Sequence, residues 1–227
     1  NGIRTTQACP LDVLNIFLNN MVIQDMPKLQ SPFVRKNIDG NFIVTPEIDP
    51  DYRWVFEDKG VTCQEKLDGA STSIVIEDGQ IKHIFNRNNR VGFFDNNPIV
   101  DAVRNSSFKG YCNFTDGQYF GESIGTDIQG NKYKLDKPLW LPFNTYFKEH
   151  LAYRTWGKYP KDYETISNWM KDGLLSLFGM VYHNGDKTYP CEGIVFHHPD
   201  GRMAKLRRDM FDWFTGARHK EILSNLK

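Results

Sequence analysis

Hydrophobic and polar positions predict a mixture of strands and helices along this chain. Residues 72–76 are rich in β-branched side chains, and residues 81–85 form a second, mostly apolar run. Asp78-Gly79 lies between them and predicts a hairpin, because glycine tolerates the positive φ that such turns require. Residues 118–121 and 193–196 have the same strand-like character.

Helical spacing of apolar side chains over residues 10–22 predicts a short amphipathic helix. Prolines then divide the following segment into short extended pieces. Further helices are predicted over residues 97–105, 163–178 and 209–226. Strands and helices do not alternate regularly, so the pattern predicts an α+β fold with largely antiparallel sheets flanked by helices.

The pattern changes near Val61, where the strand-like segments begin. We interpret residues 1–60 as an N-terminal extension packed on a main domain formed by residues 61–227. The residues of this extension identify no chemistry of their own. Our hypothesis is that they flank the candidate site described below or help to bind its partner.

Composition and charge narrow the class of protein only slightly. The chain has 227 residues, a formal net charge of +0, 40% hydrophobic residues and 25% charged residues, as in an ordinary soluble protein. It contains neither an apolar run of the ~20 residues that a membrane span needs nor the apolar start of a secretory signal. We therefore expect a cytoplasmic monomer with no membrane partner. The basic residues within 202–220 are either a local nucleic-acid patch or a solvated surface.

The segment Glu65-Lys66-Leu67-Asp68-Gly69 contains the first candidate for chemistry, the amine of Lys66. A lysine amine is a nucleophile only when deprotonated, and its free pKa is near ~10.4. A neighbouring cation, a bound metal or a dry pocket would lower that pKa. Taken alone, a Lys-x-Asp-Gly pattern is also typical of an ordinary turn.

Charged residues also stand at the ends of the predicted strands. Arg87 and Arg90 follow the second strand of the hairpin, so one of them is expected to return to the neighbourhood of Lys66. Arginine suits phosphate because its planar guanidinium donates two parallel hydrogen bonds. Glu122 ends one predicted strand and Glu192 opens another, and converging carboxylates can hold a hydrated Mg²⁺ or a ribose hydroxyl. Each of these residues is otherwise a solvated charge at a strand end.

Lys205 and Arg207 alternate with Leu206, which places both cations on one face of a predicted strand. Two cations on one face suit a phosphate chain, although charged residues also protect edge strands. A nucleophile, two carboxylates and several cations therefore lie in one chain. Such a set suits attack on a nucleoside triphosphate with metal-assisted departure of pyrophosphate.

The order and spacing of these features resemble the covalent nucleotidyltransferases, which comprise DNA ligases, RNA ligases and mRNA capping enzymes. Five motifs carry the resemblance over about two-thirds of the chain. They are Lys66-Leu67-Asp68-Gly69, Arg87, Phe120-Gly121-Glu122, Glu192-Gly193-Ile194-Val195-Phe196 and Lys205-Leu206-Arg207. Five motifs in order are far more specific than any one of them.

Within that family, the sequence looks most like the ATP-dependent RNA ligases of the phage type. The resemblance implies the nucleotidyltransferase fold, and the 19 residues after Arg208 (227 − 208) lead us to expect no C-terminal OB-fold. Arg207 departs from the second lysine that many relatives carry. The ring that stacks on the purine is also ambiguous, because Trp140, Phe143 and Phe147 compete, and we favour Phe143.

The resemblance implies a lysyl-AMP intermediate on Lys66, with ATP and Mg²⁺ (or Mn²⁺) as cofactors. The implied catalytic residues are Lys66, Asp68, Glu122, Glu192 and Lys205. The implied metal-binding residues are Asp68, Glu122 and Glu192. The implied ATP-binding residues are Glu65, Lys66, Arg87, Glu122, Phe143, Glu192, Lys205 and Arg207.

The implied partner is RNA with 5′-phosphate and 3′-hydroxyl ends, with DNA or an RNA–DNA hybrid as the alternative. Two other enzymes remain open, a GTP-dependent capping guanylyltransferase and a DNA ligase catalytic domain. A third alternative is a catalytically silent nucleic-acid-binding domain of the same fold. Formation of a covalent nucleotide adduct separates the enzymes from the silent domain.

Overall fold

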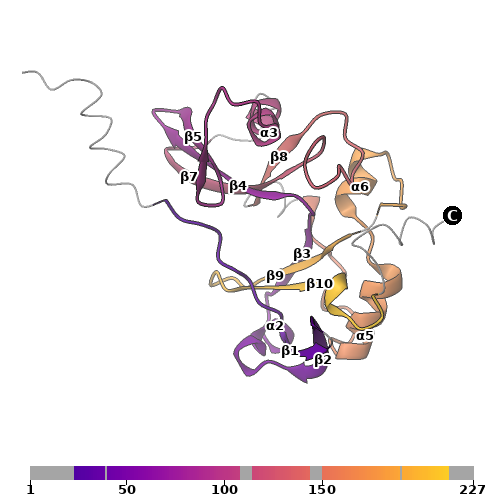
Figure 1. Cartoon of the computed structure of the whole chain (residues 1–227). Coiled ribbons are helices and arrows are strands. Elements are labelled where there is room, and N and C mark those ends of the chain that lie inside the picture. Colours follow the sequence, from indigo (N-terminus) through magenta and orange to yellow (C-terminus); the bar gives the residue numbers. More distant parts are fainter. Residues whose placement is uncertain (1–22, 39, 108–113, 144–149, 190, 215–227) are drawn as a thin grey trace, which may run out of the picture.

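The computed structural model describes residues 23–38, 40–107, 114–143, 150–189 and 191–214. Strands and short helices are mixed, and every strand pair is antiparallel. The predicted α+β class with antiparallel sheets is therefore confirmed (Figure 1). None of the helices within these ranges is long and apolar enough to cross a membrane.

A five-stranded sheet forms the upper half of the molecule in Figure 1. Its strands, in spatial order, are β6 (Asn89–Val91), β5 (Gln80–Asn86), β4 (Ala70–Glu77), β7 (Gly117–Ile124) and β8 (Leu139–Pro142). Asp78 and Gly79 have φ values of 52° and 68° and form the predicted hairpin turn. Helix α3 (Pro98–Ser107), also predicted, packs Val100 and Val103 against this sheet.

A three-stranded sheet lies below it, with β9 (Gly193–His197) between β3 (Thr62–Lys66) and β10 (Met203–Arg207). One face is buried, because alternate residues of these strands, including Ile194, Phe196 and Leu206, are core side chains. The side chains of the opposite face point away from that core.

Four short elements precede β3: β1 (Phe33–Ile38), β2 (Asn41–Ile48), η1 (Pro50–Tyr52) and α2 (Trp54–Glu57). Phe33, Val44 and Val55 belong to the same core cluster as the three-stranded sheet. This part of the predicted N-terminal extension therefore packs directly on the remainder of the chain. The helix predicted over residues 10–22 lies outside the described residues.

The single helix predicted over residues 163–178 is wrong. The structure has α5 (Tyr163–Asn168), the π-helical turn η3 (Trp169–Gly173) and a separate α6 (Leu177–Tyr182). Leu174 is extended, and the hydroxyl of Ser176 accepts a hydrogen bond from the backbone N–H of Gly179, which starts the second helix. A sequence pattern of apolar residues does not register this break, because both helices bury apolar side chains.

The helix predicted over residues 209–226 is also not formed where the structure describes it. The chain makes the short 3₁₀ turn η4 (Arg208–Met210) and then becomes extended at Phe211, whose side chain is fully buried. Burial of Phe211 in the lower core therefore overrides the helical pattern. Residues 215–226 of that prediction lie outside the described residues.

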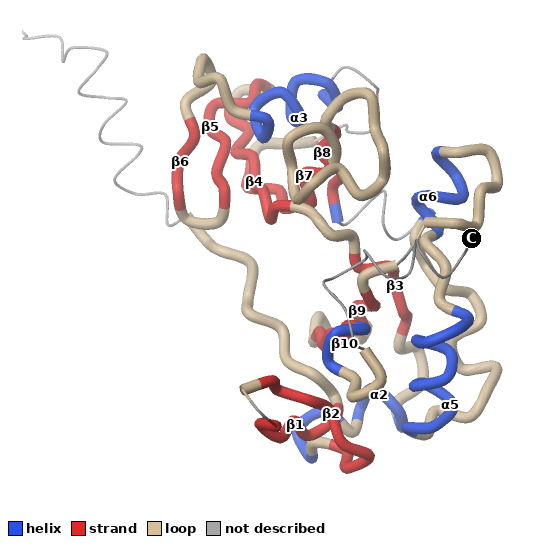
Figure 2. The backbone as a smooth tube through the Cα atoms, turned by 45° about the vertical axis from the view of Figure 1, so that its right-hand side comes forward, coloured by secondary structure: helices blue, strands red, loops and turns tan. Residues whose placement is uncertain are grey.

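The chain crosses from the lower sheet to the upper sheet at Leu67-Asp68-Gly69, between β3 and β4 (Figure 2). A Cβ on Gly69 would lie 2.3 Å from the backbone oxygen of Ser123 in β7. Only glycine allows this close approach. The glycine of the Lys-x-Asp-Gly pattern is thus required by the close packing of the chain. This packing fixes Lys66 at the junction of the two sheets.

Candidate active site

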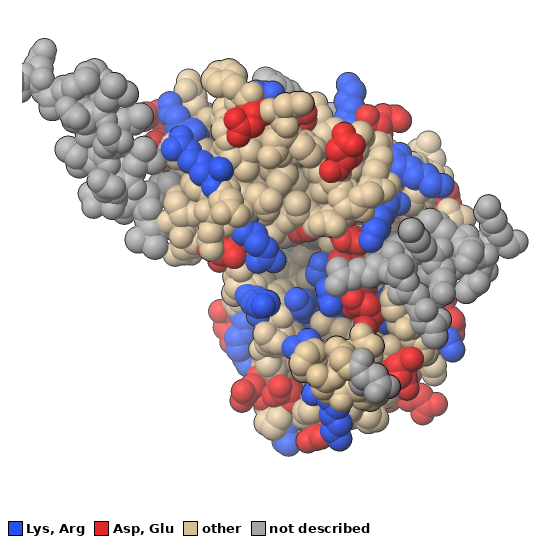
Figure 3. Space-filling model, viewed as in Figure 1, with Lys and Arg blue, Asp and Glu red and all other residues tan. Residues whose placement is uncertain are grey.

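A pocket of about 380 Å³ lies where the two sheets meet, and the open face of the three-stranded sheet forms its floor. The strand register places Lys66 opposite Gly193, and Gly193 opposite Arg207. The next row contains Val195 and Lys205. Directly paired residues project on the same face of an antiparallel sheet, so the three cations share one face. Lys66 and Lys205 line the pocket, and Arg207 lies beside Lys66 on that face. Figure 3 shows lysine and arginine side chains gathered around this junction.

Gly193 leaves the centre of the floor without a side chain. A Cβ there would lie 2.3 Å from the backbone oxygen of Leu206, so the close pairing of β9 and β10 requires glycine. The gap stands between Lys66 and Arg207 in the same row. A ligand can therefore approach the backbone between the two cations.

Lys66 is held by a buried carboxylate. Its Nζ donates a 2.6 Å hydrogen bond to Oε2 of Glu192, and the side chains are 24% and 5% exposed. Burial alone would lower the pKa of Lys66, but the carboxylates of Glu192, Glu122 and Asp68 outweigh burial and raise it. Lys66 therefore rests as an ammonium ion, and it needs to lose a proton before it can act as a nucleophile.

Glu122 lines the same pocket from β7, where it pairs with Ser71 of β4. Burial raises its pKa to about 7; Lys66 opposes this shift, while Glu192 and Asp68 add to it. Glu122 is therefore a carboxyl group that exchanges a proton near neutral pH.

Asp68 contacts Nζ of Lys132, which comes from the loop between β7 and β8. The backbone N–H of Asp68 also donates a 3.0 Å hydrogen bond to the hydroxyl of Tyr133. Both contacts hold the Lys-x-Asp-Gly turn from the side of the upper sheet. The side chains of Asp68 and Lys132 are mostly buried, so this ion pair is shielded from solvent.

The predicted metal ligands Asp68, Glu122 and Glu192 all lie around Lys66. Among the described residues, however, no group of three or more His, Cys, Asp or Glu side chains is arranged to hold a metal ion. Asp68 is paired with Lys132, and Glu192 with Lys66. The protein-held metal site therefore stays a prediction.

The competing residues lie at different places in the structure. Arg87 lines the pocket, whereas Arg90 is not among the lining residues. Phe143, predicted to stack on the purine, also lines the pocket, and its stacking role stays a prediction. Trp140 is buried in the upper core, where its indole N–H donates to the backbone oxygen of Thr72. Phe147 lies outside the described residues.

Glu65, predicted to bind ATP, points its carboxylate to the other face of β3. The carboxylate accepts hydrogen bonds from the Ser176 hydroxyl (2.6 Å) and from the backbone N–H of Phe178 (2.9 Å). It therefore caps the first turn of α6. Glu65 is one of the residues that line the pocket, but it can face a ligand there only through its backbone.

Replacing Glu65 by glutamine should remove a pH dependence of stability. Burial raises the pKa of Glu65 to about 7 from the ordinary 4.5, although the hydrogen bonds from Ser176 and Phe178 oppose the shift. The folded state thus binds this proton more tightly than the unfolded state. The resulting stabilisation is complete below pH 4.5 and is lost as pH rises through about 7. For one group this amounts to at most about 3 kcal/mol.

Denaturant unfolding at several pH values between 4.5 and 8 checks this prediction. Glu65→Gln should flatten the fall in the free energy of unfolding across that range. The exposed control Glu47→Gln should follow the wild type. An unchanged pH dependence in Glu65→Gln would contradict the buried-carboxyl account.

A strap formed by residues 23–31 closes one side of the pocket. At the upper sheet, Gln24 exchanges two hydrogen bonds with Gln118, and Asp25 lies 3.3 Å from Arg87. At the lower sheet, the backbone oxygen of Gln30 accepts a 2.8 Å hydrogen bond from the backbone N–H of Lys205. Figure 2 shows this segment running from one sheet to the other. Residues 26–29 of this strap therefore line the pocket.

Several pocket residues could not be found from the sequence. The strap contributes Met26, Pro27, Lys28 and Leu29, and the upper loop contributes Gln129. Lys132 reaches Asp68 from that same loop. None of these residues belongs to a recognisable pattern, because tertiary contacts alone bring them to Lys66.

Comparison with solved structures finds similarity to an RNA ligase of Naegleria gruberi. Its form with pyrophosphate has a TM-score of 0.48 and 22% identity, over 82% of this chain and 58% of that chain. A mutant with ATP and Mn has a TM-score of 0.47 and 20% identity, with the same coverage. A mutant without ligand has a TM-score of 0.44 and 19% identity, over 84% of this chain and 59% of that chain.

The chain thus spans less than two-thirds of the length of these ligases. No family model matches the sequence, and no curated protein matches it. We therefore base the function on the geometry around Lys66 and on the order of the motifs.

Proposed function

We propose that this protein is an ATP-dependent RNA ligase that forms a lysyl-AMP intermediate on Lys66. The observation that carries the proposal is the position of the Lys66 amine on the floor of a pocket. It is hydrogen-bonded to Glu192 at 2.6 Å and flanked on the same face by Lys205 and Arg207. A nucleophile, a proton acceptor and phosphate-binding cations are thus in one place.

The first step transfers AMP to the protein. Nζ of Lys66 gives up a proton, and Glu192 is the acceptor already in contact with it. The amine then attacks the α-phosphorus of ATP, so that an N–P bond forms while the P–O bond to pyrophosphate breaks. Lys205 and Arg207 stabilise the negative charge that gathers on the phosphate oxygens and the departing pyrophosphate.

The later steps use the activated AMP. An oxygen of an RNA 5′-phosphate attacks the phosphorus of lysyl-AMP, which breaks the N–P bond and returns the amine of Lys66. A 3′-hydroxyl then attacks the RNA phosphate, loses its proton and displaces AMP. Arg87, in the pocket wall with an exposed guanidinium, suits the 5′-phosphate or the phosphate of AMP. Phe143, also in the wall, suits the face of the adenine ring.

Intact mass after incubation with ATP and Mg²⁺ tests the first step. We expect the addition of one AMP, and its loss when RNA with a 5′-phosphate is added. An adduct with GTP but not with ATP would favour a capping guanylyltransferase. No adduct on protein that arrives free of nucleotide would reject the ligase and favour the silent nucleic-acid-binding domain.

Lys205 should make nucleotide binding depend on pH. Burial lowers its pKa to about 8, and the nearby cations Arg207 and Lys66 lower it as well, against the pull of Glu192. Lys205 therefore loses its charge as pH rises through about 8, and its attraction for phosphate goes with it. We test this with an ATP analogue that has a methylene between the α- and β-phosphates. Its affinity should fall about tenfold once the pH is one unit above the pKa of Lys205.

Lys205→Arg is the informative variant, since its guanidinium stays charged throughout this range. It should keep a nearly constant affinity between pH 7 and 9 in equilibrium titrations. The exposed control Lys36→Arg should retain the wild-type fall. Equal falls in all three proteins would show that Lys205 is not the titrating group.

A further inference from the structure

We propose that a second, aromatic pocket beside β3 binds unpaired bases of the RNA strand. This inference deepens the proposed function, on which its choice of RNA rests. The pocket shares no lining residue with the pocket around Lys66. It is nevertheless tied to the same strand, because the backbone N–H of Tyr153 donates a 2.8 Å hydrogen bond to Cys63 of β3.

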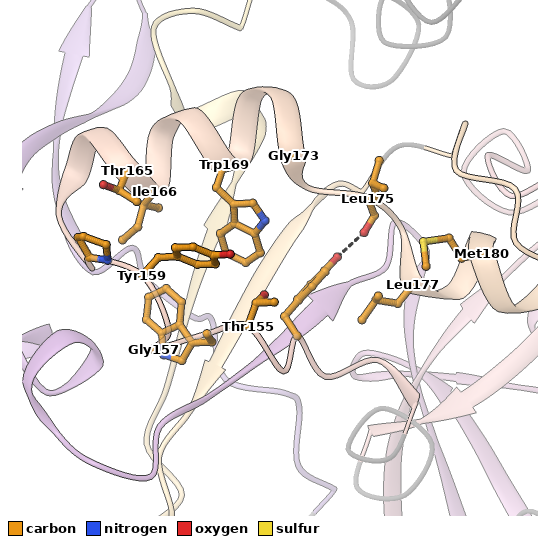
Figure 4. Close-up of a pocket in the computed structure, with 13 residues that line it drawn as sticks. Thr155, Gly157, Tyr159, Thr165, Ile166, Trp169, Gly173, Leu175, Leu177 and Met180 are labelled. Carbon is orange, nitrogen blue, oxygen red and sulfur yellow. Dashed lines mark hydrogen bonds between the residues drawn. The ribbon is translucent and has the colours of Figure 1, made fainter.

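The cavity has a volume of about 490 Å³ and lies between the loop 153–160 and the α5–η3–α6 segment. Figure 4 shows Tyr159 and Trp169 among the side chains that line it, with Leu177 and Met180 at the other end. The hydroxyl of Tyr153 donates a 2.7 Å hydrogen bond to the backbone oxygen of Leu175, which fixes the ring in the wall. The size suits one or two flat, ring-shaped groups.

Four aromatic side chains supply the walls: Tyr153, Trp156, Tyr159 and Trp169. The rings of Tyr153 and Trp169 meet edge to face at 5.3 Å, and Trp156 packs on the core ring of Phe196 at 4.8 Å. These rings are therefore anchored. Tyr159 differs, because it is 68% exposed and makes no ring contact among the described residues. A large exposed ring at the mouth of an aromatic pocket is available to stack on a base.

Cations lie on the loop that forms one side of the pocket. Between His150 and Lys161 the sequence contains Arg154, Lys158 and Lys161, whereas Asp162, Glu164 and Asp172 belong to the α5–η3 side. Arg154 and Lys158 are exposed, while the ammonium of Lys161 lies 5.2 Å above the ring of Trp156. Cations interleaved with aromatic rings are the arrangement by which proteins bind single-stranded nucleic acid.

One further feature favours a strand over an isolated small molecule. A second hollow shares Tyr153, Thr155 and Leu177 with the aromatic pocket, and Arg154 lines it. The two hollows therefore adjoin, with a cation at the second one.

Binding of a fluorescently labelled, single-stranded RNA without a 5′-phosphate tests this inference, since it cannot be ligated. Tyr159→Ala should weaken binding about 5- to 150-fold, which is the usual effect of losing one stacked base. Tyr159→Phe should bind as the wild type does, whereas Tyr159→Leu should resemble the alanine variant. A duplex of the same sequence should be insensitive to all three, because its bases are already stacked.

The matched control for the exposed ring is Phe94→Ala, since Phe94 is 96% exposed on the upper half of the molecule. Lys158→Ala should reduce the slope of log affinity against log salt concentration by about 0.7, as expected for one lost phosphate contact. The exposed control Lys36→Ala should leave that slope unchanged. Unchanged binding in Tyr159→Ala, or an equal loss in Phe94→Ala, would overturn the inference.

Three further outcomes separate this inference from the proposed function. Tyr159→Ala should form the lysyl-AMP adduct at the wild-type rate, because the two pockets share no residue. An absent adduct with intact, Tyr159-dependent RNA binding would reject the ligase and keep the RNA pocket. If Tyr159→Ala changes the oligomeric state but not RNA binding, the pocket holds a protein surface. That outcome would overturn the inference.

Discussion

Lys66→Ala should abolish the covalent addition of AMP while noncovalent binding of ATP remains. The amine of Lys66 is the proposed nucleophile on the pocket floor, and no other described amine is hydrogen-bonded to Glu192. The proposed phosphate-binding cations Lys205 and Arg207 are retained in the variant. Removal of a nucleophile commonly costs as much as removal of the whole catalytic set, so we expect a loss on the order of 10⁶-fold. Intact mass after incubation with ATP and Mg²⁺ measures it.

In the alanine variant, Glu192 keeps only Arg207, at 3.8 Å, as an ion-pair partner among the described residues, so the variant loses some stability. Lys66→Arg is the better matched replacement, because it keeps a cation beside Glu192 but offers a guanidinium that does not lose its proton. It should fold normally and form no adduct. The exposed control Lys36→Ala should form the adduct fully. An adduct on Lys66→Arg would place the nucleophile elsewhere.

Glu192→Gln should slow adduct formation about 10²- to 10⁴-fold, the usual contribution of a proton acceptor in contact with the reacting group. Glutamine keeps the size of the side chain and one oxygen acceptor, so the β9 strand and its pairing with Lys66 should survive. It cannot take up the proton that Lys66 must lose. The rate of AMP addition under single-turnover conditions measures the effect.

The pH profile of the same variant gives a second, independent readout. Of the three carboxylates that raise the pKa of Lys66, Glu192 has the largest effect. Without its charge that pKa falls, so the rise of the rate with pH should begin at lower pH in Glu192→Gln. The exposed control Glu47→Gln should keep the wild-type rate and profile. A slower rate with an unshifted profile would mean that Glu192 acts only on the position of Lys66.

Strands and tight turns were predictable because their causes are local. Asp78 and Gly79 take the positive φ values that a two-residue hairpin needs, and β4 and β5 follow from their β-branched residues. The helix over residues 163–178 was predicted as one element because its apolar pattern continues across the break at Leu174. The break is set by contacts with Glu65, more than a hundred residues away.

The roles predicted for the site residues stay predictions, and the structure shows only where these residues lie. Lys66, Glu122 and Lys205 line one pocket. Glu192 is hydrogen-bonded to Lys66, and Arg207 lies on the same face of the sheet as Lys66. The same reasoning predicted a nucleotide contact for the Glu65 side chain. In the structure this carboxylate faces α6, since neighbouring residues of a strand point to opposite faces.

The sequence by itself determined the α+β class, the hairpin and the order of the reactive residues, because these depend on local backbone preferences and residue type. Only the tertiary structure decided which groups touch. It paired Lys66 with Glu192, distinguished Arg87 from Arg90 and Phe143 from Trp140, and brought the strap to the pocket wall. Such contacts join residues far apart in the chain, and their energies depend on burial and distance, which no sequence spacing specifies.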